Sequence, residues 1–145
     1  KDINLHQAVS NINGEIEIYF KKPFSFLNTT DLNHAKIYFN NDFNKKTIKC
    51  NTLNFIISNS KFKDQEIDFL NIDVEGAELN VLKGLSFITY KPKIICIEIL
   101  GFSKYDYFKR EIEIKKNDVY NFLLDNGYKK VWSGSHFLSH IFIRN

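Results

Sequence analysis

Residues 67–78 read IDFLNIDVEGAE, and the hydrophobic pattern changes its period within this stretch. Up to Ile72 the composition is that of a short β-strand that runs into Asp73. From Val74 onward, apolar residues recur at helical spacing as far as Leu85. The stretch therefore predicts a strand followed directly by a helix, which is the repeating unit of an α/β fold.

The segments after residue 90 extend this pattern. Residues 94–100 form a nearly continuous apolar run, which is typical of a strand buried on both faces of a parallel sheet. Residues 115–126 have helical spacing, and residues 128–132 and 137–143 read as two strands joined in an antiparallel hairpin. We therefore expect a mostly parallel sheet with a terminal antiparallel hairpin.

The first half of the chain carries weaker signals. Residues 3–8 and 15–20 alternate between apolar and polar and predict strands, and residues 47–51 predict another. A short helix should follow, with Thr52 or Asn51 at its N-cap.

Two segments are predicted to be loops. Residues 24–45 are rich in Asn and Asp, and their only periodic part, residues 36–39, predicts one short strand. Residues 101–110 read as an aromatic, charged loop.

Composition excludes several classes of protein. A length of 145 residues with 43% hydrophobic and 26% charged residues fits one soluble globular domain. Two cysteines cannot form a disulfide scaffold, and so few fit a reducing cytoplasm. No apolar run approaches the roughly 20 residues that span a bilayer. The net charge of +3 comes from scattered Lys, which indicates solvated faces and no nucleic-acid partner.

The densest group of chemically active side chains is Asp73, Glu75 and Glu78, at the junction of the predicted strand and helix. Ligands of open α/β sheets bind beyond the carboxyl ends of the strands. Carboxylates there can act as a general base, a metal ligand or an anchor for a hydroxyl. The alternative is structural, because Asp is a good N-cap and acids in a first helical turn complement the helix dipole.

Glu98 interrupts the apolar run of residues 94–100. A buried carboxylate without a partner is costly, so Glu98 is expected to be paired or to lie at the exposed end of its strand, near the strand tips. It could also be a structural acceptor for a neighbouring loop. His136 and His140 lie in or beside a strand pattern, and we expect no metal site from them.

Taken in order, these segments resemble a known family. Residues 67–78, then residues 81–84, Pro92 and residues 94–98, closely resemble the carboxyl-terminal half of FkbM-type methyltransferases.

The earlier segments add to this resemblance. Residues 8–10 and 13–17 look like the part after the third strand of that family, and residues 47–56 look like its next strand and short helix. The resemblance covers most of residues 3–100, whereas residues 101–145 match only in architecture.

The resemblance implies a class I, Rossmann-like fold that uses S-adenosylmethionine, as one domain over residues 1–145. In such a fold a first strand and a glycine-rich turn hold the cofactor, and neither precedes Ile3. The chain begins with Lys1 and contains no Met. We therefore expect an N-terminally truncated domain that lacks the first strands, so that the parent protein is the enzyme and the isolated chain is not competent.

The implied reaction is transfer of a methyl group to a hydroxyl of a sugar, glycan or natural product. It needs an in-line approach and a base for the hydroxyl proton. Asp73 is the first candidate for the residue beside the reacting hydroxyl, as base, orienting group or metal ligand. Glu75 and Glu98 are further catalytic candidates, and Glu78 is a substrate-binding candidate.

The resemblance also places Ala8, Val9 and Ser10 near the adenine end of the cofactor, with Asp73 as a further cofactor contact. The alternative is a non-catalytic α/β binding or assembly module that lacks the cofactor half. In either case the missing strands would leave an open sheet edge, through which we expect the chain to associate with itself.

Overall fold

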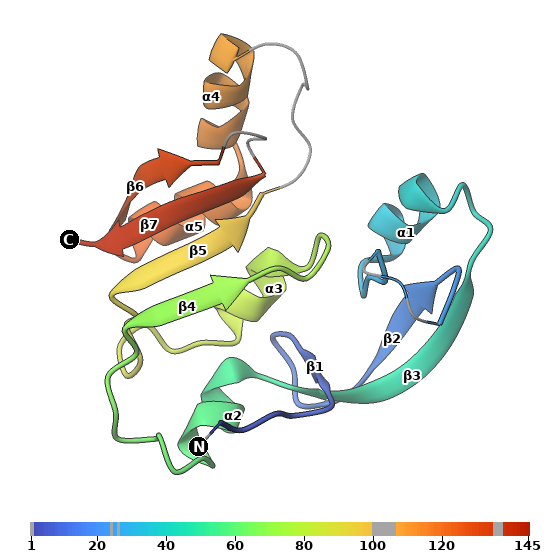
Figure 1. The fold of residues 1–145 in the computed structure, drawn as a ribbon, viewed down its shortest axis with the longest axis horizontal. Coiled ribbons are helices and arrows are strands. Elements are labelled where there is room, and N and C mark those ends of the chain that lie inside the picture. The colour runs from blue at the N-terminus through green and yellow to red at the C-terminus, as the bar shows by residue number, and fades with distance from the viewer. Residues whose placement is uncertain (1, 24, 26, 100–106, 135–137) are drawn as a thin grey trace.

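The computed structural model describes residues 2–23, 25, 27–99, 107–134 and 138–145. The strands are β1 (Ala8–Val9), β2 (Gly14–Phe20), β3 (Asn44–Asn51), β4 (Phe69–Ile72), β5 (Ile94–Glu98), β6 (Tyr128–Ser133) and β7 (Ser139–Arg144). The helices are α1 (Leu32–Tyr38), α2 (Leu53–Ser58), α3 (Glu78–Lys83), α4 (Tyr107–Lys115) and α5 (Asp118–Asp125). The elements form two parts (Figure 1): a small part from β1 to β3 and a main part from α2 to β7.

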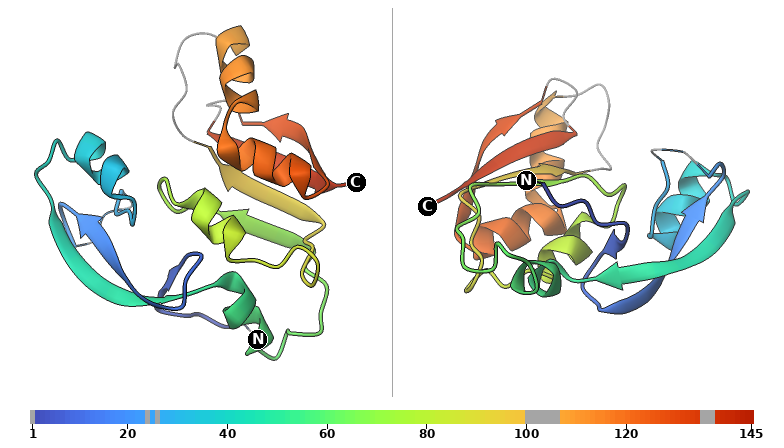
Figure 2. Two further views of the ribbon diagram at one scale, coloured as in Figure 1. Left: turned by 180° about the vertical axis from the view of Figure 1, so that it is seen from behind. Right: turned by 60° about the horizontal axis from the view of Figure 1, so that its bottom comes forward.

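The main part is built on a four-stranded sheet in the order β4-β5-β7-β6. β4 and β5 are parallel, whereas β7 is antiparallel to both β5 and β6. Helices α3 and α5 lie on one face of this sheet (Figure 2). Ile95 and Phe142 on that face are fully buried against Leu82 of α3 and Leu123 of α5, and this contact forms the main core.

The small part contains a three-stranded sheet in the order β1-β3-β2, with β1 parallel and β2 antiparallel to β3. Helix α1 packs on β2, and a small core of Tyr19, Ala35 and Phe39 lies between them. Its N-cap is Asp31, whose side chain accepts a hydrogen bond from the backbone N–H of His34. The small part therefore has its own core, separate from that of the main sheet.

Much of the predicted α/β order is confirmed. The strand–helix–strand unit of β4, α3 and β5 is present, and β6 and β7 form the expected antiparallel hairpin. Helix α2 begins after Thr52, whose side chain accepts from Phe55 N–H as an N-cap. A mixed α/β fold is thus confirmed.

The sheet arrangement differs from the expectation of one mostly parallel sheet. The strands form two sheets, and the larger one contains a single parallel pair in the described residues. The strand predicted over residues 3–8 is reduced to β1, which pairs with β3 only at Ala8 and Val9. The predicted loop of residues 24–45 contains α1 where a short strand was expected, and α4 occupies residues 107–110 of the other predicted loop.

Helix α3 is shorter than the pattern predicts. It begins at Glu78, because Glu75 has φ 54° and Gly76 has φ 99°, and neither value continues a right-handed helix. Glu75 therefore lies in a turn before α3, not in its first turn as expected. None of the helices in the described part of the chain is long and apolar enough to cross a bilayer.

Candidate active site

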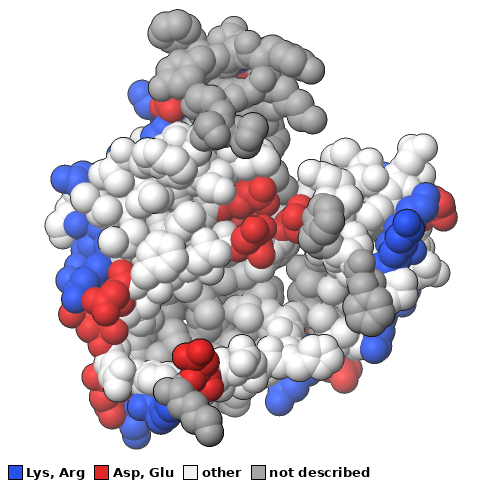
Figure 3. Space-filling model, viewed as in Figure 1, with Lys and Arg blue, Asp and Glu red and all other residues white. Residues whose placement is uncertain are grey.

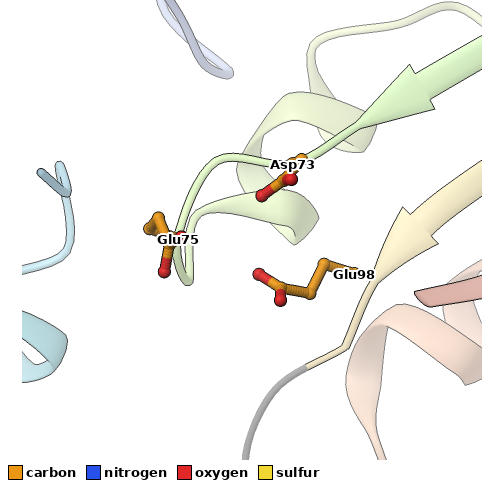
Figure 4. A group of neighbouring side chains, drawn as sticks. All are labelled: Asp73, Glu75 and Glu98. Atoms are coloured by element: carbon orange, nitrogen blue, oxygen red, sulfur yellow. The ribbon is translucent and has the colours of Figure 1, made fainter. Parts of the chain in front are cut away.

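Three carboxylates meet at one end of the main sheet. Asp73 follows β4 directly, Glu75 lies at the tip of the next turn, and Glu98 is the last residue of β5. One carboxylate oxygen from each lies within 4.8 Å of the others. Figure 4 shows the three side chains directed into the same space, from two neighbouring strand ends.

The strand register explains this meeting. Because β4 and β5 are parallel and Ile72 pairs with Ile97, the residues that follow each of them emerge at the same sheet edge. Asp73 and Glu98 are these residues. The sequence predicts both residues at the ends of strands. Because the two strands pair in parallel, these ends lie side by side and the two carboxylates come close together.

The electrostatics of this acid cluster (Asp73, Glu75 and Glu98) are unusual. Burial raises the pKa of Glu98 to about 7, and the carboxylates of Glu75, Asp73 and Glu78 add to the effect. Glu98 Oε2 is buried and receives no hydrogen bond from any residue that the structure describes. Burial and the charge of Asp73 also raise the pKa of Glu75. The charge of His34 partly offsets this upward shift.

No Lys or Arg side chain among the described residues forms a salt bridge with this cluster. In the space-filling view, acidic side chains gather near the middle of the face, and the blue Lys and Arg groups lie away from them (Figure 3). The salt bridges of the described residues likewise involve other carboxylates, such as Glu17, Glu66 and Glu111. A bound ligand with positive charge would therefore be favoured at this place.

Glu78, the predicted substrate-binding candidate, is buried beneath the turn that carries Glu75. The residue is only 3% exposed, and Oε1 accepts hydrogen bonds of 3.2 Å from the backbone N–H groups of Val74 and Gly76. Glu78 thus stabilises the turn that carries Glu75 through the backbone N–H groups on either side of that residue. Asp73 does not cap α3, because Ala77 occupies the N-cap position without a side-chain bond.

A cleft of about 620 Å³ lies between the small part and the acid cluster. Ala8 and Val9, predicted cofactor contacts, line it together with Asp73. The other lining residues come mostly from β2, β3 and their loops: His6, Gln7, Ile18, Asn28, Thr30, Lys46, Thr47, Ile48, Lys49 and Val74. Ser10 does not line the cleft, because it is buried with its carbonyl oxygen packed against Gly84.

The structure adds residues that sequence reasoning missed. Thr29 Oγ1 donates a 2.6 Å hydrogen bond to the Glu75 carbonyl oxygen, and His34 Nδ1 lies 2.5 Å from the same oxygen. Tyr38 packs edge-on against His34, and its pKa is raised by burial and by the charges of Glu75 and Glu98. The available signal was the spacing of four between His34 and Tyr38, which a helix converts into neighbours.

Of His136 and His140, from which no metal site is expected, the structure describes only His140. His136 lies outside the described residues. His140 is fully buried in β7, with Nδ1 3.0 Å from Ser133 Oγ. The described group that could share one metal ion is instead the acid cluster, whose oxygens are ligands of the kind that hard divalent cations prefer.

Comparison with known proteins identifies the family. The family model described as methyltransferase FkbM domain matches residues 1–130. The chain therefore belongs to the FkbM family of methyltransferase domains, as the motif of residues 67–78 indicates. The sequence resemblance covers most of residues 3–100, whereas the match to the family model continues to residue 130. No curated protein and no solved structure matches the chain.

Proposed function

We propose that this chain acts in O-methyl transfer, from S-adenosylmethionine to a hydroxyl group of a sugar, glycan or natural product. The observation that carries the proposal is Glu98, a carboxyl with a pKa of about 7 at the strand tips, beside Asp73 and Glu75. A base with a pKa near the working pH is the most effective acceptor of a hydroxyl proton.

The cleft has the properties that this cofactor requires. Its volume is within the range of small-molecule sites, and its wall combines apolar side chains such as Val9 and Ile48 with polar ones. The sulfonium group of the cofactor is positively charged, which suits an acid cluster that no described Lys or Arg neutralises. Ala8 and Val9 would contact the adenine end, with Asp73 at the other end. When bound, the cofactor supplies a methyl group to the substrate oxygen.

Glu98 would accept the substrate proton on a carboxylate oxygen. At pH values above about 7 it is ionised, and its buried Oε2 has no competing donor among the described residues. Asp73 and Glu75 keep its proton affinity high, because their negative charges disfavour ionisation of a third carboxyl nearby. Asp73, the more exposed residue at the cleft wall, would orient the hydroxyl.

The acid cluster offers a second way to activate a hydroxyl. One hard divalent cation shared by Asp73, Glu75 and Glu98 would lower the pKa of a bound hydroxyl, so that its proton could pass to solvent water. Calorimetric titration with Mg²⁺ separates the two mechanisms. Binding that is lost in Glu98→Gln supports the cation mechanism, whereas no binding supports Glu98 as the base.

The central test is binding of S-adenosylmethionine by calorimetry, followed by transfer of a labelled methyl group to mixed glycan acceptors. We expect Asp73→Asn to weaken binding and Glu98→Gln to retain it while losing transfer about 100-fold. Asp68→Asn is the matched control, because Asp68 is exposed and pairs with Lys93 at the other end of β4. The titration uses the wild-type protein at its full natural length, and absence of cofactor binding there would contradict the proposal.

A further inference from the structure

The carbonyl oxygen of Glu75 receives two hydrogen bonds from the small part. Thr29 Oγ1 lies 2.6 Å from it and His34 Nδ1 lies 2.5 Å from it, across sequence separations of 46 and 41 residues. A carbonyl oxygen only accepts, so both side chains donate. The Nδ1 atom of His34 therefore carries a proton in this arrangement.

Both donors are themselves fixed in place. Thr29 is buried, and its Oγ1 accepts a 3.0 Å hydrogen bond from Asp31 N–H. The hydroxyl proton of Thr29 is therefore directed away from Asp31 N–H and is available to the Glu75 carbonyl oxygen. The backbone N–H of His34 donates to Asp31 Oδ1 at 2.7 Å, in the first turn of α1. The Tyr38 ring packs edge-on against the His34 ring, with centroids 4.3 Å apart. Side chains held in this way can restrain the group that they contact.

The turn that they contact needs restraint. Glu75 has a left-handed backbone with φ 54°, which is costly for a residue with a Cβ atom. Glu78 Oε1 holds this turn from the main part, through the N–H groups of Val74 and Gly76. Thr29 and His34 hold it from the opposite side, and in Figure 1 the loop after β4 extends toward the small part.

We propose that Thr29 and His34 are positioning residues that hold the Glu75 turn, so that the small part sets the geometry of the acid cluster on the main part. Their hydrogen bonds fix the main chain at residue 75, and a carboxylate oxygen of Glu75 lies within 4.8 Å of one of Glu98. This placement does not depend on the reaction, whereas its consequence for catalysis rests on the proposed methyl transfer.

The test compares two variants of His34. His34→Leu removes the donor but retains bulk, and His34→Asn puts an amide N–H close to the position of Nδ1. Amide hydrogen exchange at Val74 and Gly76 reports the stability of the turn without any assay of activity. We expect His34→Leu to speed exchange at both amides about tenfold, the change that loss of one ordinary hydrogen bond gives, and His34→Asn to restore it.

Thr29→Ser serves as a second conservative variant, because it keeps the hydroxyl and should exchange as wild type. If His34→Leu does not fold, the outcome depends on His34→Asn: wild-type exchange supports the proposal, and fast exchange overturns it. A folded His34→Leu with unchanged exchange also overturns it.

A second readout concerns catalysis. If the wild-type chain or its parent transfers methyl groups, His34→Leu should lower kcat about tenfold with little change in KM, and His34→Asn should recover it. If the wild-type protein at its full natural length binds no S-adenosylmethionine, the proposed function fails. The exchange measurement then still decides whether Thr29 and His34 position the turn.

Discussion

A carboxyl group that titrates near neutrality, Glu98, affects stability as well as chemistry. Its pKa is about 7 in the folded chain and near 4.5 when unfolded. Between these values the folded state binds the proton and the unfolded state does not, so stability falls as the pH rises from about 4.5 to 7. Below this window the contribution is fully present.

We therefore expect Glu98→Gln to stabilise the protein at pH 8 by on the order of 1–3 kcal/mol, because it removes a buried charge. Urea unfolding at pH 5 and pH 8 measures the change. At pH 5 the gain should be small. Glu66→Gln is the control, because Lys93 and Arg144 lower the pKa of that exposed carboxyl. An equal gain at both pH values would show that Glu98 ionises normally.

Gly76 faces two separate constraints. Its φ of 99° disfavours any residue with a Cβ atom, and a Cβ there would lie 2.7 Å from His34 Nδ1. We expect Gly76→Ala to cost about 2–4 kcal/mol in thermal or urea unfolding. Gly14→Ala isolates the first constraint, since its φ is 136° and nothing lies within 4 Å, and should cost only about 1 kcal/mol. Equal costs would contradict a close approach of His34.

Residue identity predicted one half of the site and missed the other. Asp73 and Glu98 could be assigned to strand tips because they interrupt or end strong strand patterns. Glu75 was misplaced, since only the fold shows that its backbone is left-handed. His34 could not be found, because its partner is a main-chain oxygen, and backbone acceptors leave no trace in the sequence.

Among the elements, α3 depends on a close contact with β1. A Cβ atom at Gly84 would overlap the carbonyl oxygen of Ser10, which is buried at the end of β1. Gly84 O also accepts a 2.9 Å hydrogen bond from Asn54 N–H of α2. The end of α3 thus joins the main part to the wall of the cleft.

We expect Gly84→Ala to destabilise the chain by about 1–3 kcal/mol, the usual cost of overpacking, and to loosen the Ala8–Val9 wall of the cleft. Urea unfolding measures the first effect. Lys83→Ala, an exposed change one residue earlier, should alter stability by less than about 0.5 kcal/mol. A Gly84→Ala protein as stable as wild type would show that β1 can shift freely from α3.

The elements that sequence predicts well here are those with a strong period. β2 and the β6–β7 hairpin alternate, and α5 has clear helical spacing. The sequence predicts a loop with a short strand at residues 36–39 in place of helix α1, because this helix is short and Ala35 is its only described buried residue. It forms because it packs on β2 and is capped by Asp31, and such tertiary contacts override weak local preference.

At the scale of the whole molecule, α3 and α5 cover one face of the main sheet among the elements that the structure describes. Paired residues share a face, so the pairing of Phe69 with Ile94 places both opposite the face that α3 and α5 cover. Phe69 is 55% exposed and Ile94 is 37% exposed, and Trp132 on the same face is 50% exposed. Exposed apolar faces of this kind mark contact surfaces.

The edge of this sheet is open as well. Among the described residues, no strand pairs with β4 on the side away from β5, so its N–H and C=O groups there remain available. Edge strands without charged side chains or a cover pair readily with other chains. The open edge and the apolar face meet at Phe69, which belongs to both.

We therefore expect the chain to associate with itself through β4. Light scattering coupled to size exclusion should give a mass above the 17.1 kDa monomer, rising with concentration. Phe69→Lys should restore the monomer, because a charged residue on an edge strand opposes pairing. Ile88→Lys is the control, since Ile88 is 98% exposed outside this face and its change should leave the mass distribution as in wild type. A wild-type chain that stays monomeric at millimolar concentration would mean that the apolar face alone is too weak to draw two edges together.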